Sequence, residues 1–351
     1  MTETRRSFWQ RSWVAPAVLL GLVAFPFGLS LFTGSPLTSG TPKFWQGLLA
    51  QVFILAVYAM SYDLLMGYTG ILSFGHAMFF GAGAYATGIL LKHAHWSLAP
   101  VVLAVVGVAI VQGILIGIVS LRVRGVYLAM VTLAFAQMFF ILSQATDFRD
   151  ITGAEDGLHG IPVPAWLNPT SQRLTFYFLA LTFCVLMYVV ARRVVDSPPG
   201  RVMVAIRENE ARAQMIGFNT FLFKLIAVTL SGVMAALAGL MNALWNLNAT
   251  PDVLSVDTTI NALLMTIIGG VGTLVGPMLG AGVLQLLGYW LNIIFGPQWP
   301  LIIGIVYILL VLFLPYGVVG TWQHRRPDLV AGWARLLKPL EPRSRRTRTH
   351  P

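Results

Sequence analysis

The sequence predicts an all-α polytopic membrane protein with about ten transmembrane helices, some of them short or broken. Of its 351 residues, 57% are hydrophobic and only 10% are charged, whereas soluble domains carry about 25% charged residues. No Asp, Glu, Lys or Arg occurs between Asp257 and Arg325. One bilayer span needs about 20 apolar residues, so this window alone can hold three. Because a charge at mid-membrane is costly, the charged residues are confined to the gaps between spans.

Hydropathy and the charged gaps divide the chain into a short N-terminus (1–12), a transmembrane domain (13–320) and a basic tail (321–351). Two hydrophilic segments, 146–173 and 193–219, are too long to be simple turns. The spans are expected at residues 13–33, 47–67, 76–92, 98–120, 126–145, 174–192, 220–246, 258–272, 277–296 and 299–315. The eighth span is short, and the second and third are candidates for a broken or re-entrant shape.

The distribution of basic residues predicts that both termini and segment 193–219 are cytoplasmic, whereas segment 146–173 is external. With this orientation, most of the 23 Lys and Arg residues lie inside, as the positive-inside rule expects. Those left outside are Lys43, Lys92, Arg149 and Arg173. Membrane orientation therefore accounts for the net charge of +10, and no nucleic-acid partner is expected. The arginines of the tail could contact anionic lipid, although a solvated tail is the simpler interpretation.

The first interruption of an apolar run extends from Gly67 to His76. Helix breaks within membranes often build transporter binding sites, whereas small residues can also serve tight helix packing. Asp63 and His76 flank this break and are either functional ionisable groups or residues of the cytoplasmic interface. The candidates that it contributes to the translocation path are Gly67, Gly70, Ser73, Gly75 and His76.

The second interruption is glycine-rich and ends at Pro277, which is expected to open the next helix. It resembles a phosphate-binding loop but lacks the required lysine, and no G-x-x-x-x-G-K-[ST] motif occurs in the chain. A helix break is therefore the better interpretation. The further candidates for the translocation path are Gly269, Gly270, Gly272 and Gly276.

Segment 201–217 is predicted to form one short amphipathic helix at the cytoplasmic face. Its apolar positions fall on one helical face, and Gly217 is a plausible C-cap. Such a helix could rest on lipid. The mixture of Glu208 and Glu210 with arginines instead favours a docking surface for a soluble partner.

Four segments, 67–85, 152–162, 201–217 and 269–282, together resemble the LivM-type permease of branched-chain amino acid ABC importers. The resemblance implies an ABC importer permease fold in the bacterial inner membrane. It also implies a sister permease subunit, two cytoplasmic ATP-binding subunits and an external solute-binding protein. ATP and Mg²⁺ would bind to the partner subunits, and this chain would bind no cofactor.

The same resemblance implies that helix 201–217 is the coupling helix that contacts the ATPases. Glu210-Ala211 and Gly217 are similar to the E-A-A…G loop of ABC permeases, although the Glu-to-Gly spacing is one residue longer than usual. The coupling candidates are Arg207, Glu208, Glu210, Ala211 and Gly217.

Three other functions remain to be weighed. A permease of this architecture for urea or another small polar solute fits the spans equally well. An ion-driven transporter needs acids or histidines deep in the membrane, where only Asp63 and His76 come close. A membrane enzyme needs clustered acids and bases, which the long charge-free run disfavours.

Cys184, the single cysteine, forms no multi-cysteine metal site. We therefore expect no catalytic or metal-binding residue.

Overall fold

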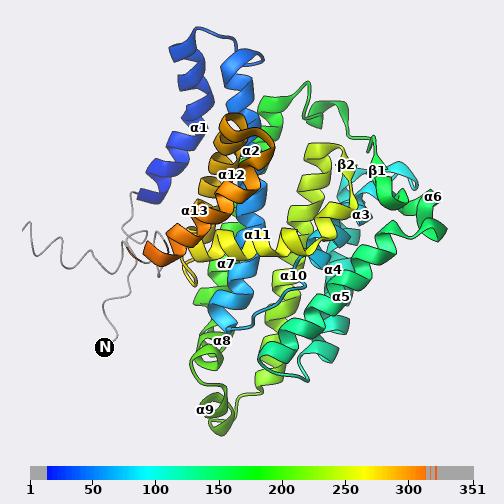
Figure 1. Ribbon diagram of the computed structural model, residues 1–351, viewed down its shortest axis with the longest axis vertical. Coiled ribbons are helices and arrows are strands. Elements are labelled where there is room, and N and C mark those ends of the chain that lie inside the picture. Colours follow the sequence, from blue (N-terminus) through cyan, green and yellow to red (C-terminus); the bar gives the residue numbers. More distant parts are fainter. Residues whose placement is uncertain (1–13, 314–316, 318–320, 322–351) are drawn as a thin grey trace, which may run out of the picture.

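The computed structural model describes residues 14–313 together with 317 and 321. The predicted cytoplasmic N-terminus and most of the basic tail lie outside the described residues. The described chain is almost entirely helical (Figure 1). Its principal helices are α1 (Val14–Thr33), α2 (Gly40–Asp63), α3 (Ala77–Lys92), α4 (Leu98–Ser120), α5 (Val126–Gln144), α7 (Arg173–Asp196), α10 (Thr220–Asn246), α11 (Val256–Gly269), α12 (Val275–Phe295) and α13 (Trp299–Phe313).

Each predicted span corresponds to one of these principal helices. Smaller elements connect the helices to one another. Within the described residues, seven helical stretches are long and apolar enough to cross a membrane. Helices α12 and α13 belong to one such stretch, whereas α3 and α11 are apolar but shorter. The smaller elements are a π-helical turn (Leu64–Tyr68), α6 (Arg149–Thr152), α8 (Pro198–Glu208), α9 (Glu210–Met215), β1 (Leu158–His159), β2 (Asn248–Ala249) and short 3-10 turns.

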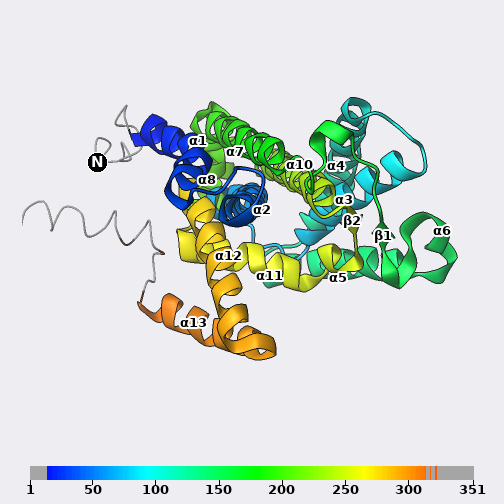
Figure 2. The same cartoon turned by 90° about the horizontal axis from the view of Figure 1, so that it is seen from above.

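Helix α2 forms the centre of the molecule and packs against α7, α10, α11 and α12 (Figure 2). Its side chains are buried around most of its circumference, including the aromatic rings of Tyr58 and Tyr62. A helix that is apolar on all sides belongs in such a core. Helix α10 packs against α3 and α4 as well. Gly83 and Gly239 allow α3 and α10 to approach closely, because a Cβ atom on either would collide with the other helix.

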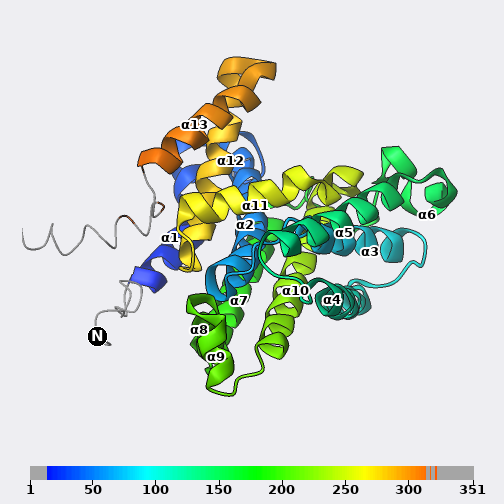
Figure 3. The same ribbon diagram turned by 60° about the horizontal axis from the view of Figure 1, so that its bottom comes forward.

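Helix α11 packs against α2 and runs crosswise to it (Figures 1 and 3). Just before it, β2 pairs antiparallel with β1, so that Leu158 lies opposite Ala249. Segment 146–173 is therefore a folded loop, held to the end of α10 by a short strand pair. Helices α8 and α9 lie toward the opposite end of α10.

Both glycine-rich segments break helices, as the sequence predicts. Helix α2 ends in the π-helical turn, and α3 begins only at Ala77. Helix α11 ends at Gly269, and the backbone then passes through positive φ at Gly270, Gly272 and Leu274 before α12 begins.

Candidate functional site

The two helix breaks meet at Asp63, the last residue of α2. Its side chain is fully buried. One carboxylate oxygen accepts a hydrogen bond from the backbone N–H of Gly272 (2.6 Å), and the other accepts from Leu274 (3.0 Å). These N–H groups lie just before α12, where a helix start leaves donors without partners. Asp63 thereby joins two segments that lie 209 residues apart in the sequence.

Glycine is needed where the two breaks touch. A Cβ atom on Gly67 would collide with the Asp63 carboxylate and lie 2.6 Å from the backbone nitrogen of Gly272. Gly272 has a φ of 77°, a value that favours glycine. The predicted path residues Gly67 and Gly272 are therefore direct neighbours.

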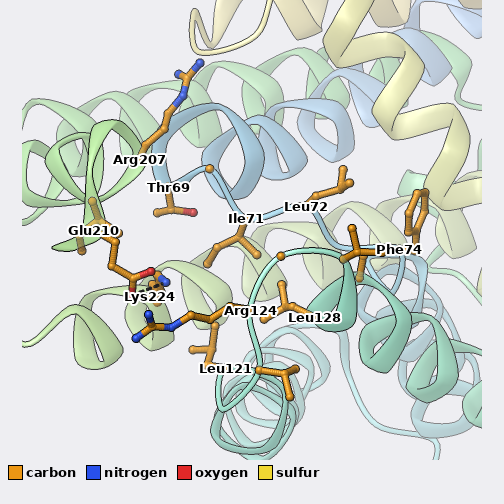
Figure 4. Close-up of a pocket in the computed structure, with 16 residues that line it drawn as sticks. Thr69, Ile71, Leu72, Phe74, Leu121, Arg124, Leu128, Arg207, Glu210 and Lys224 are labelled. Carbon is orange, nitrogen blue, oxygen red and sulfur yellow. Dashed lines mark ion pairs between the residues drawn. The ribbon is translucent and has the colours of Figure 1, made fainter.

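Arg207, on α8, reaches the same point. Its guanidinium donates a hydrogen bond to the carbonyl oxygen of Gly67. A Cβ atom on Gly70 would lie 3.1 Å from Arg207 Cγ, and one on Gly272 would lie 3.0 Å from Arg207 Nη1. In Figure 4 the Arg207 side chain points away from Glu210 and Lys224. The predicted coupling segment thus contacts residues of both breaks.

The segment predicted as one amphipathic helix is two helices, so this prediction was wrong. Asn209 is extended (φ −162°, ψ 99°) and separates α8 from α9. The side chain of Asn209 accepts a hydrogen bond from the backbone N–H of Arg212 (2.9 Å), which caps α9. Asn209 favours a capping position over a helix interior, so one helix ends here and the next begins.

Gly217 ends α9, as predicted. Its φ is 98°, and its N–H donates to the carbonyl of Gln214, whereas the N–H of Phe218 donates to the carbonyl of Ala213. This pair of hydrogen bonds is a Schellman motif, which commonly places glycine after a helix.

Glu210 is bound within the chain. Lys224 Nζ lies 2.6 Å from its carboxylate, and the Thr220 hydroxyl donates a hydrogen bond to it at 3.2 Å. Burial acts to raise the pKa of Glu210, but the hydrogen bond and charge of Lys224, with help from Thr220 and Arg124, hold this pKa below its ordinary value. The charged side chain therefore fastens α9 to the start of α10.

The outer end of the α8–α9 loop carries exposed side chains, unlike Glu210. Two of the predicted coupling residues, Glu208 and Ala211, are exposed. The apolar side chains of Met215 and Ile216 are 82% and 69% exposed. Neither residue is among the coupling candidates chosen from the sequence. Their sequence signal is apolar character at the end of an otherwise charged helix.

A cavity of about 450 Å³ lies between α8, the first break and the turn joining α4 to α5 (Figure 4). Its wall includes Gly70 among the path candidates and Arg207 and Glu210 among the coupling candidates. Arg124 and Lys224 add positive charge beside apolar side chains such as Leu128. Residues of the predicted coupling loop and of the first break therefore line the same cavity.

The other path candidates shape the breaks. The His76 imidazole is fully buried, so it does not lie at an exposed interface, and its Nε2 lies 2.8 Å from the Ser61 hydroxyl. The Tyr62 hydroxyl donates to the carbonyl of Ser73 (3.1 Å). A Cβ atom on Gly75 would collide with the backbone of Thr132. A Cβ atom on Gly269 would collide with the backbone of Gly276, so these two glycines are in close contact between α11 and α12.

Within the part of the chain that the structure describes, no cluster of three or more His, Cys, Asp or Glu could hold a metal ion. The ionisable groups of the site instead bind backbone groups and one another.

Comparison with known proteins agrees with this architecture. Residues 45–314 match the family described as "Branched-chain amino acid transport system / permease component". The chain is 27% identical to the high-affinity branched-chain amino acid permease LivM of Escherichia coli K12, covering 89% of this chain and 75% of that protein. It is 24% identical to a probable LivM of Methanocaldococcus jannaschii (86% and 93% covered). It is also 23% identical to the ribose import permease RbsC of Haemophilus influenzae (89% and 94% covered). No solved structure matches the chain.

The family match covers most of the chain and both helix breaks. Together with the apolar helices, it identifies a multi-pass helical protein of the inner membrane. The chain therefore belongs to the family of branched-chain amino acid transport permeases, and it is a LivM-type transport subunit of an ABC importer and not an enzyme.

Proposed function

We propose that this chain is the translocation subunit of an ATP-driven importer of branched-chain amino acids. It works beside a sister permease, with two cytoplasmic ATP-binding subunits and an external solute-binding protein. ATP and Mg²⁺ bind to the ATP-binding subunits, and this chain binds no cofactor. The family description and the LivM relatives support the substrate class.

The observation that carries the coupling function is the folded loop α8–α9, which combines an exposed apolar end with an inner contact to the membrane helices. Met215 and Ile216 offer an apolar docking surface, and Arg207 contacts the first break. A loop with only the outer surface could bind an ATPase but could not pass its movement on. Both contacts together suit a coupling element.

The orientation belongs to the same proposal. The loop α8–α9 and both termini are cytoplasmic, and the loop at 146–173 is external. The excess of basic residues on the proposed cytoplasmic side supports this orientation. The two loops also lie toward opposite ends of α10, as a transmembrane arrangement requires.

In the proposed cycle, closure of the ATP-binding subunits moves α8 and α9, and the membrane helices bend at their breaks. The breaks are suited to this role because their backbone is already released from regular helical hydrogen bonding. The cavity between this chain and its sister would then switch from facing outward to facing inward. Specificity can reside in the external binding protein, so the cavity needs little affinity of its own.

The proposed function is tested by purifying the tagged chain with its partners in mild detergent and measuring ATP hydrolysis. Turnover should rise when a binding protein loaded with leucine, isoleucine or valine is added. Stimulation by ribose-loaded or urea-loaded binding protein alone would reassign the substrate. If the chain purifies without an ATPase and uptake collapses with the proton gradient, it is an ion-driven transporter instead.

A pair of variants tests the docking surface within the same experiment. Ile216→Glu places a charge on the exposed end of the cytoplasmic loop and should reduce ATPase co-purification. Ile151→Glu makes the same change at an exposed residue of α6, on the proposed external side, and should not. Equal ATPase recovery with both variants would contradict docking at Ile216.

A further inference from the structure

Resting on the proposed function, we propose that Asp63 and Arg207 are positioning residues that link the cytoplasmic loop to both helix breaks. In this relay, Arg207 holds the first break through Gly67, and Asp63 holds the second break through Gly272 and Leu274. The relay makes α8, the end of α2 and the start of α12 move together. Neither residue needs to touch the transported substrate.

The first step is the attachment of Asp63 to the second break. Leu274 has φ 57° and ψ −45°, a conformation that residues other than glycine rarely adopt. Such strained backbone persists only where surrounding contacts hold it. The two N–H groups that bind the Asp63 carboxylate flank Thr273 within this strained segment. Without the carboxylate, the N–H groups of the half-buried Gly272 and the buried Leu274 would have no partner from α2.

The second step is the attachment of Arg207 to the first break. Arg207 donates to the carbonyl of Gly67, one turn beyond Asp63, and its guanidinium also lies against Gly272. Gly272 is itself bound by Asp63. A residue of the cytoplasmic loop and a buried residue of α2 therefore meet the same two glycines.

The third step follows from close packing. Gly67 lies against both Asp63 and Gly272, with no space for a Cβ atom. A shift of α8 that moves Arg207 must therefore move Gly67, and Gly67 cannot move without displacing its neighbours. The movement would reach α12 at its first turn, which directly follows the break. Arg207 and Arg212 are both exposed, but the described contact of Arg212 is a backbone hydrogen bond within the loop.

The first test compares transport with ATP hydrolysis in liposomes containing the complete transporter. Arg207→Gln and Asp63→Asn should each lower uptake per ATP hydrolysed roughly tenfold, a size typical of coupling between sites. Arg207→Lys should restore part of the loss because it retains a charged donor. Arg212→Gln, which removes the same charge from the same loop, should leave the ratio unchanged. The double variant should be no worse than either single variant, since residues of one relay are not additive.

The second test measures hydrogen exchange of the peptide covering residues 270–278 in the purified chain. Arg207→Gln should speed exchange there, although it changes a residue of a different element, whereas Arg212→Gln should not. Unchanged exchange in Arg207→Gln, or additive losses of coupling in the double variant, would overturn the relay. This readout remains decisive if Asp63→Asn fails to fold. It also remains decisive if the wild-type complex shows no ATP-driven uptake, a result that would refute the proposed function and leave the relay standing.

Discussion

Asp63 shows how a single carboxylate can be accommodated in the buried interior of the protein. A buried carboxylate is costly unless its oxygens accept hydrogen bonds. Both oxygens of Asp63 do so, and both donors are backbone N–H groups of the second break. From the sequence, Asp63 was either a functional group or a residue of the interface. Its complete burial rules out an exposed interface position within the described structure.

Gly67→Ala should destabilise the protein by about 1–3 kcal/mol, the usual cost of forcing atoms into a packed site. The added methyl group would collide with the Asp63 carboxylate and approach the backbone nitrogen of Gly272. Thermal unfolding in detergent measures the change. Gly107→Ala, in α4, is the matched control, because a Cβ atom there meets nothing within 4 Å. Equal stability of the two variants would show that the breaks are not in contact.

Glu210→Gln should destabilise the attachment of α9 to α10 by about 0.5–1 kcal/mol, since the ion pair is partly exposed and screened by solvent. The lowered pKa of Glu210 sets the pH dependence of this effect. The charged carboxylate contributes its full stabilisation above the ordinary value of 4.5, and this is lost as pH falls through the lowered pKa. Melting temperatures of wild type and variant should therefore differ at pH 7 and converge in stronger acid. A gap that stays constant with pH would contradict the ion-pair assignment, and Glu208→Gln is the exposed control.

At the scale of elements, the α8–α9 loop gains its shape from caps at three positions. The Ser197 hydroxyl accepts from the N–H of Gly200 at the start of α8 (3.4 Å), Asn209 caps α9, and Gly217 ends it. Asn209 defines the junction between α8 and α9, whereas Ser197 and Gly217 define the outer ends of the two helices. These caps give both short helices defined ends, which is what the proposed coupling function requires of the loop.

Gly217→Ala should distort this loop and uncouple ATP hydrolysis from uptake while membrane insertion remains intact. Alanine at the positive φ of Gly217 costs about 1 kcal/mol, and asparagine should be tolerated better. Gly160→Ala provides the control in the loop at 146–173. Gly160 also has a positive φ, and a Cβ atom on either glycine meets nothing within 4 Å. Normal coupling in Gly217→Ala would remove this glycine from the coupling function.

At the scale of the whole molecule, the packing divides into a buried centre and an apolar periphery. Helix α2 is buried on most sides, whereas α1, α4 and α5 expose large apolar side chains such as Leu31, Leu103 and Val126. In water these surfaces would drive aggregation, but in a bilayer they can face lipid or a sister permease. The whole-molecule architecture therefore depends on the membrane as a solvent.

Cysteine labelling should show that the two long loops lie on opposite sides of the membrane. Cys184 is the single cysteine, so Cys184→Ser provides a background without thiols. In that background Glu208→Cys should react with an impermeant reagent only in inverted vesicles, and Glu155→Cys only in intact cells. Both positions are exposed in the structure. Labelling of both from the same side would refute the proposed orientation.

The sequence by itself determined which segments form membrane helices and where these helices break. Apolar runs, excluded charges and glycine-rich interruptions act within a few residues of chain, so they can be read locally. The same local patterns carried the resemblance to LivM-type permeases, which the family match confirms. The prediction of a single helix over 201–217 was wrong because it rested on apolar periodicity and did not include the preference of Asn209 for a helix N-cap.

Only the tertiary structure decided which breaks meet and which charges pair. The partners of Asp63 and Arg207 are backbone groups, and every residue other than proline carries such groups, so no residue type marks them in the sequence. Glu210 resembled a docking residue by its position and was found bound to Lys224. These pairings depend on how helices distant in the chain pack around α2, and that packing is a property of the folded whole.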